Sequence, residues 1–197
     1  MLSTNLICTA QKNTNRIIDI GNIEQIDINL DEVYKIKITT SKTAKIKITT
    51  HSEGEYYNDI ALETTRESNT LKIKSTYPAI LTGGYDKLSA HKVFSLEVEI
   101  SIPEDMVVNT YSNLAAVIAQ GKFKSFRANL KQGYCKLTNV SGEVAINTFK
   151  GDIIVATKTG SIKANTRHGN LHLPEFLSGK NPITLMSIDG DITVLKN

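Results

Sequence analysis

Glycine recurs at a fixed spacing of nine residues in the second half of this chain. The four positions are Gly142, Gly151, Gly160 and Gly169. The residues two positions after the glycine position of each nine-residue unit form an apolar column, made of Cys135, Val144, Ile153, Ile162 and Leu171. Four residues after it lies a second, made of Leu137, Ile146, Val155, Ala164 and Leu173. Alternation of this kind predicts a β-strand of about five residues followed by a bend of about four.

The two columns define a nine-residue frame that keeps its register from Val108 to Leu173. Three extra residues around "PEFLSGKNP" interrupt the frame, which resumes with Ile183 and Ile192. Repetition at a fixed spacing means that each unit stacks on equivalent residues of another, which is typical of a solenoid. The sequence therefore predicts a parallel β-helix, or β-solenoid, over residues 103–197. Nine-residue units fit a coil of two faces or of three, and both remain open.

The first part of the chain, residues 1–102, is also rich in strand patterns, but their spacing is looser. The stretches "KIKITTSKTAKIKITT" and "VFSLEVEISIP" alternate apolar and polar residues, as half-buried strands do. We expect one all-β domain over residues 1–197, with a less regular N-terminal half and a regular C-terminal half.

Polar residues in the repeats have structural interpretations. A column six residues after the glycine frame, made of Asn139, Thr148, Thr157 and Thr166, is expected to hydrogen-bond between stacked units. Cys135 stands in an apolar column and is predicted to be a buried thiol. A calcium β-roll needs an aspartate in every unit, whereas the six residues after the glycines include two aspartates and one glutamate, which cannot form a continuous row of ligands. With no cysteine or histidine motif for a metal either, we predict no metal and no cofactor.

Charge and hydropathy exclude two classes of partner. The net charge of +3 is spread along the chain rather than gathered into the basic patch of a nucleic-acid-binding protein. No run approaches the roughly 20 apolar residues that span a bilayer, so no transmembrane segment is expected. No export signal is visible at the start of the sequence.

The order of several motifs resembles the bacterial putative-adhesin families, in particular the "toast-rack" type. The matching stretches, over residues 16–195, are "VYKIKITTS", "AKIKITT", "NTLKIKS", "LEVEISIPEDM" and the repeats "GEVAI", "GDIIV", "GSIKA" and "GDITV". The resemblance implies a single-domain, β-helix-like protein associated with the bacterial cell envelope. It brings no catalytic site with it.

Two classes of function follow. The first is a non-enzymatic adhesin or envelope module that binds a surface glycan or a protein, with a homodimer compatible with its flat faces. The second is a polysaccharide lyase or hydrolase, since β-helices carry such enzymes and two carboxylates roughly 5–9.5 Å apart cleave glycosidic bonds. Glu143 and Asp152 share a frame position and would meet if their units stacked directly. We favour the first class and assign no catalytic residue.

Four residues are candidate ligand contacts. Tyr77 and Tyr85 flank a pair of adjacent glycines in a long irregular segment, where aromatic side chains could face a ligand. Glu143 and Asp152 complete the set.

Overall fold

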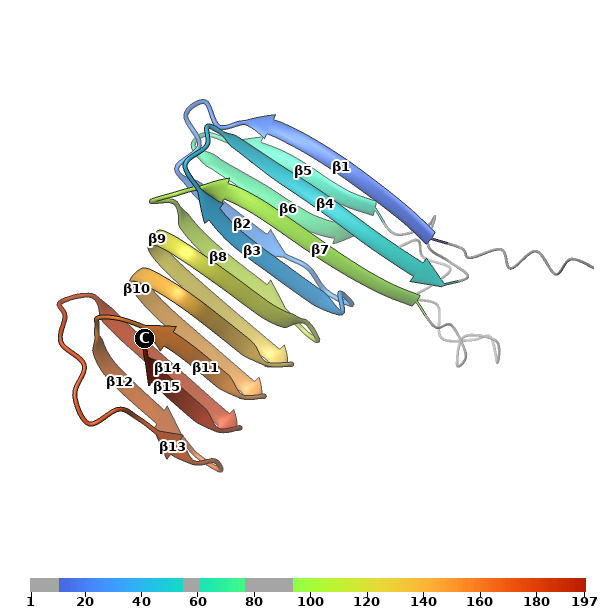
Figure 1. Cartoon of the computed structure of the whole chain (residues 1–197). Helices are drawn as coiled ribbons and strands as arrows, with labels where there is room; N and C mark the ends of the chain where they lie inside the picture. The colour runs from blue at the N-terminus through green and yellow to red at the C-terminus, as the bar shows by residue number, and fades with distance from the viewer. Residues whose placement is uncertain (1–10, 55–60, 77–93) are drawn as a thin grey trace, which may run out of the picture.

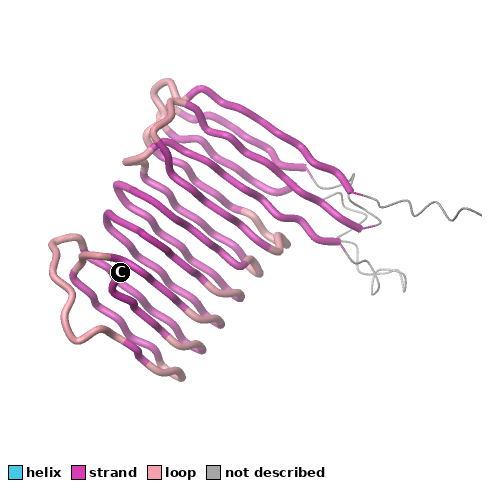
Figure 2. The backbone as a smooth tube through the Cα atoms, viewed as in Figure 1, coloured by secondary structure: helices cyan, strands magenta, loops and turns pink. Residues whose placement is uncertain are grey.

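The computed structural model describes residues 11–54, 61–76 and 94–197, and all regular structure in these ranges is β-strand (Figure 1). Within these ranges there is no helix long and apolar enough to cross a membrane. The strands form one large sheet of 15 strands that folds into two facing layers and does not close on itself (Figure 2). The all-β prediction is confirmed.

The first layer runs from the N-terminal to the C-terminal end of the molecule. Its strands, in spatial order, are β1 (Gln11–Asp19), β4 (Lys45–Gly54), β7 (Phe94–Pro103), β3 (Lys35–Ser41), the first part of β9 (Ala116–Gln132), the first part of β10 (Cys135–Lys150), β11 (Ile153–Thr157), β15 (Ile192–Lys196) and β13 (Leu171–His172). β1, β4 and β7 pair antiparallel, and the other neighbours pair parallel.

The second layer lies behind the first. Its strands are β5 (Ala61–Glu67), β6 (Thr70–Thr76), β2 (Gln25–Asn29), β8 (Val107–Ser112), the second parts of β9 and β10, β14 (Pro182–Asp189) and β12 (Ser161–Thr166). Among the strands that the structure describes in this layer, only β5 and β6 pair antiparallel. The looser spacing of the first hundred residues thus corresponds to antiparallel pairs at one end of the molecule.

β9 and β10 belong to both layers because each bends sharply in its middle. In β10 the bend falls at Gly142, whose φ is 109°. A Cβ at this position would lie 1.9 Å from the carbonyl oxygen of Phe123 on the neighbouring strand. Glycine is required here because both the backbone conformation and the close approach exclude a side chain.

The parallel strands keep one register. Val108 pairs with Phe126 and Phe126 with Val144, so paired positions are separated by two units of the nine-residue frame. In the first layer Cys135 pairs with Ile153 at the same offset of two units. Consecutive units therefore alternate between the two layers.

The core lies between the layers and is built from every second residue of each strand. Ile36 and Ile38 of β3 face inward from the first layer, and Ile26 and Ile28 of β2 from the second, all four fully buried. These belong to one apolar cluster that continues through both halves of the chain to Val194. Alternation in the sequence thus translates directly into burial.

At the C-terminal end the strands do not follow the order of the sequence. β14 lies between β10 and β12, and β15 lies between β11 and β13. Val144 therefore pairs with Ile183, which is 2% exposed, instead of with Ile162. The short strand β13 becomes the edge of the first layer, and Leu171 and Leu173 are 45% and 44% exposed although the frame predicts core positions for both.

Candidate binding surface

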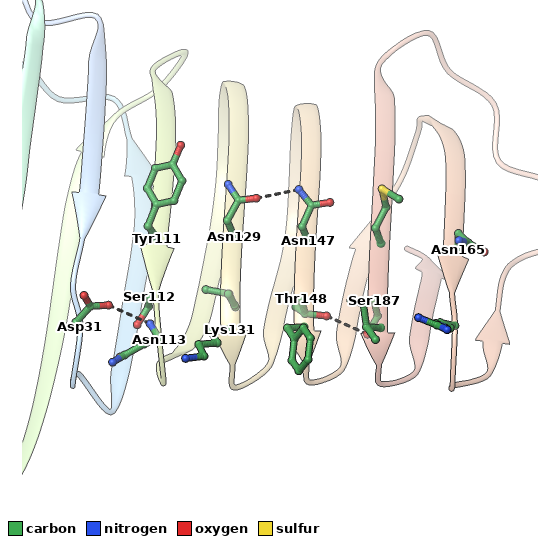
Figure 3. Close-up of a pocket in the computed structure, with 15 residues that line it drawn as sticks. Asp31, Tyr111, Ser112, Asn113, Asn129, Lys131, Asn147, Thr148, Asn165 and Ser187 are labelled. Carbon is green, nitrogen blue, oxygen red and sulfur yellow. Dashed lines mark hydrogen bonds between the residues drawn. The ribbon is translucent and has the colours of Figure 1, made fainter.

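Five outward-facing side chains form a row across the second layer. We call it the amide row, and it consists of Tyr111, Asn129, Asn147, Met186 and Asn165 on β8, β9, β10, β14 and β12 (Figure 3). Each member is in register with the next, and residues paired in this way project from the same face of the sheet. Tyr111 and Met186 are 45% and 48% exposed.

The centre of the amide row is an asparagine ladder. Nδ2 of Asn147 donates a hydrogen bond of 2.9 Å to Oδ1 of Asn129 (Figure 3). An amide side chain has two donor hydrogens and an acceptor oxygen with two lone pairs. The bond between the two amides therefore restrains their orientation and leaves further donor and acceptor sites on each of them.

A second row lies two residues further along the same strands. We call it the cationic row, and it consists of Lys131, Phe149, Ile188 and Arg167. The residue directly before each member pairs with the equivalent residue of the adjacent strand, in the order β9, β10, β14 and β12. Phe149 is 56% and Ile188 38% exposed. The row thus combines two exposed apolar side chains with a cation at each end.

The two rows line an open groove of about 790 Å³ that runs across the strands. Asp31 and Asn113 lie at its N-terminal end (Figure 3). There the backbone N–H of Asn113 donates to Oδ1 of Asp31 at 3.2 Å, so this carboxylate holds the turn before the groove. We call this feature the second-layer groove.

Two buried threonine hydroxyls are satisfied within the protein, one beneath the groove and one in the first layer. The hydroxyl of Thr148 donates to the carbonyl of Gly151 at 2.9 Å and lies 3.0 Å from Oγ of Ser187 (Figure 3). Thr157 donates likewise to the carbonyl of Val140 at 2.9 Å. Of the polar column predicted from the sequence, Thr148 and Thr157 thus point inward. Thr166 is half-buried and donates to the carbonyl of Gly190 at 2.8 Å, whereas Asn139 is exposed and its Oδ1 accepts a hydrogen bond of 2.9 Å from Nδ2 of Asn197.

The structure separates the two acidic candidates. Glu143 begins the second-layer part of β10, where it pairs with Ser125, whereas Asp152 lies in the bend before β11 of the first layer. Because paired positions are separated by two units, equivalent residues of consecutive units fall on different layers. The direct stacking required for a carboxylate pair is absent.

Asp152 has a structural partner. Its Oδ1 accepts a hydrogen bond of 2.9 Å from the backbone N–H of Asp191, and Oδ1 of Asp191 accepts one of 2.7 Å from the N–H of Asn170. Each carboxylate thus holds the next bend in the stack. Tyr77 and Tyr85 lie outside the described residues.

Cys135 is fully buried, and its thiol is free, as the sequence predicts. Burial without a charged partner raises the pKa of this thiol to about 12. The described part of the chain contains no group of three or more histidine, cysteine or acidic side chains that could hold a metal ion.

The sequence interpretation missed the second-layer groove, although a signal for it exists. Tyr111, Asn129, Asn147 and Asn165 recur at a constant interval of two units of the frame. This period is visible only when the chain is read with two units per repeat.

Comparison with solved structures identifies the fold. A putative cell adhesion protein from Clostridium sporogenes matches 95% of this chain and 100% of its own, with a TM-score of 0.70 and 16% sequence identity. A putative adhesin from Bacteroides fragilis matches 93% of this chain and 97% of its own, with a TM-score of 0.38 and 12% identity. No family model and no curated protein matches the chain. The first of these likenesses shows that the chain has the fold of a bacterial putative adhesin, the family that its sequence motifs resemble.

Proposed function

We propose that this protein is a non-enzymatic bacterial binding module of the adhesin type, and that the second-layer groove is its binding surface. The observation that carries the proposal is the groove itself, where exposed Tyr111, Phe149 and Met186 surround the asparagine ladder. Large apolar side chains gathered on an exposed sheet face mark interaction sites in soluble proteins. The shared fold with a protein described as a putative cell adhesion protein supports the same role and a location at the cell surface.

The proposal includes an architecture that suits this role. We infer a two-faced β-solenoid over residues 103–197, within a single domain of residues 1–197. Support comes from the offset of two units between paired positions in both layers. Stacked units of this kind produce a long, flat face on which equivalent side chains align, and such faces suit extended ligands.

The four residues named from the sequence as candidate ligand contacts are not equally good candidates. Glu143 precedes Asn147 by four residues on β10, and side chains an even number apart share a face, so we retain it as a proposed contact on the same face, about 13 Å from Asn147 and outside the lining of the groove. Tyr77 and Tyr85 remain proposed contacts. Asp152 is a weaker candidate because it belongs to the first layer and holds the N–H of Asp191.

A retention assay tests the proposal. Purified protein is passed over immobilised bacterial and host surface polysaccharides and matrix proteins, and the eluate is analysed by mass spectrometry. The groove variant is Tyr111→Ala/Phe149→Ala, and the matched control is Tyr34→Ala/Tyr134→Ala, which removes two exposed aromatic rings beside the first layer. We expect retention by the wild type and the control and loss of retention by the groove variant.

Other outcomes of this assay contradict the proposal in distinct ways. Equal retention of both variants would place binding elsewhere on the molecule. Retention of no immobilised surface by the wild type would remove the adhesin role. Cleavage products in the eluate would make the protein an enzyme.

A further inference from the structure

Building on the proposed function, we propose that the second-layer groove binds a linear, anionic glycan, which lies across the strands with about one sugar ring over each strand. The inference rests on the direction of the groove, the chemistry of the amide row and the charge of the cationic row.

The direction of the groove favours a polymer that crosses the strands. The amide row takes one side chain from each of β8, β9, β10, β14 and β12. Neighbouring strands lie about 4.8 Å apart, so the row is about 19 Å long. This spacing is close to the length of a sugar ring in an extended polysaccharide, so successive rings can meet equivalent side chains.

An extended peptide fits this surface poorly. Its residues advance by about 3.3 Å, which is out of step with the strands. Peptides that bind to sheets add to an edge strand and use its unpaired backbone groups. The groove lies on the face of the sheet, and its three middle strands β9, β10 and β14 are paired on both sides.

The amide row offers what neutral parts of a sugar require. Asn129 and Asn147 are held by their mutual hydrogen bond and still present donors and acceptors to hydroxyl groups on a ligand. Tyr111 and Phe149, both about half exposed, supply ring faces against which the C–H faces of sugar rings can pack.

The charge of the lining selects an anionic chain. Lys131 and Arg167 form no ion pair with any residue that the structure describes. Asp31, the one acidic residue of the described lining, accepts the N–H of Asn113. Lys131 on β9 and Arg167, the residue directly after β12, are three strand steps apart, about 14 Å, so a ligand of about four rings spans both cations.

Titration calorimetry with defined oligosaccharides tests the inference. The probes are unbranched oligomers of a uronic acid with two, four and six rings, together with the same oligomers after reduction of their carboxyl groups to alcohols. We expect the four-ring and six-ring uronates to bind, the two-ring uronate to bind at least about tenfold more weakly, and the neutral oligomers to bind at least about tenfold more weakly than their acidic counterparts.

Two variants separate the contributions. Lys131→Gln/Arg167→Gln is expected to weaken uronate binding at least about tenfold and to flatten its salt dependence, while leaving neutral oligomers unaffected. The matched control is Lys136→Gln/Lys158→Gln, which removes two exposed lysines outside the groove. Asn129→Ala/Asn147→Ala should weaken binding of both kinds of oligomer.

Several results would overturn this inference. Equal binding of acidic and neutral oligomers would refute the charge argument. A homodimer in light scattering that Phe149→Glu dissociates would assign the groove to a second copy of the chain. Groove-dependent retention on a matrix protein without binding of any uronate would refute the glycan inference and leave the proposed function intact, whereas retention on no surface at all would refute both.

Discussion

Gly151 occupies a bend where a side chain has no room. Its φ is 151°, and a Cβ would lie 1.8 Å from the carbonyl oxygen of Gly133 in the preceding turn. We expect Gly151→Val to lower the free energy of unfolding by more than about 2 kcal/mol, because the stacked turns must separate. Urea denaturation followed by circular dichroism measures this loss. Lys136→Val, on an exposed strand position, is the control and should change stability by less than about 0.5 kcal/mol.

Ile153 shows the cost of a charge inside the stack. It is fully buried and pairs with Cys135 on one side and Ile192 on the other. Ile153→Asp should cost about 4 kcal/mol or more, because it removes packing and buries an unpaired carboxylate. Ile154→Asp, on the outer face of the same strand, should cost far less. Similar melting temperatures for the two variants would contradict the assignment of inner and outer faces.

The thiol of Cys135 should be inert in the folded protein. Burial raises its pKa to about 12, so almost no reactive thiolate is present at pH 8. In a Cys8→Ala background, a disulfide reagent should label no thiol until urea unfolds the chain. Since the unfolded thiol ionises near pH 9, this group also lowers stability as the pH rises from about 9 towards 12. Rapid labelling of the folded protein would show that the core opens locally.

At the level of elements, the sequence predicts where strands lie better than it predicts which strands pair. The nine-residue frame places Ile153 and Val155 correctly in the core because alternation alone determines which face a side chain occupies. Pairing is different. Ile162 and Ile183 share one frame position and are the same residue type, so the local pattern fits Val144 equally well with either. The interruption around "PEFLSGKNP" marks the break before β14, but nothing in the frame predicts that β14 lies between β10 and β12.

Packing explains which arrangement is adopted. The inserted strand β14 carries Ile183 and Leu185, both of which become buried. In β12 the equivalent positions are Ile162 and Ala164, which are only partly buried at the edge. A larger side chain gains more from burial than alanine does, so the end of the stack is more stable with β14 inside.

Removal of the last two strands should restore sequential pairing. In a chain that ends at residue 175, β12 can pair with β10 at the usual offset of two units, which brings Ala145 beside Lys163. With Ala145→Cys/Lys163→Cys in a Cys8→Ala background, we expect a disulfide in the shortened chain. None should form in the full chain, because Thr184 of β14 lies between the two positions and the Cα atoms are about 9.6 Å apart.

Mass spectrometry under non-reducing conditions detects this disulfide. A shortened chain that folds without forming it would show that β12 cannot replace β14. A disulfide in the full chain would show that β14 leaves its position in solution.

For the whole molecule, the position of the amide row depends on how many faces a coil of nine-residue units has. Asn129, Asn147 and Asn165 recur in every second unit, but this recurrence predicts a surface row only if two units make one repeat. The nine-residue frame fits three faces equally well, and then the same residues would point in different directions. Met186 enters the row through the inserted strand, so sequential repeats alone could not place it there.

The open, stacked architecture also predicts how the molecule comes apart. Each strand contacts only its neighbours in the stack and, across the core, the facing layer, so stability should be distributed as in a repeat protein. We expect amide hydrogen exchange to be slowest in β9 and β10, which belong to both layers in the middle of the sheet, and to quicken towards β12 and β13 at one end and β1 and β5 at the other. Exchange followed by mass spectrometry resolves these segments. In Ile153→Asp the protection of β11 and β15 should fall more than that of β1 and β4, because the perturbation spreads through nearest neighbours. Equal loss of protection at both ends would instead mean that the whole sheet unfolds as one cooperative unit.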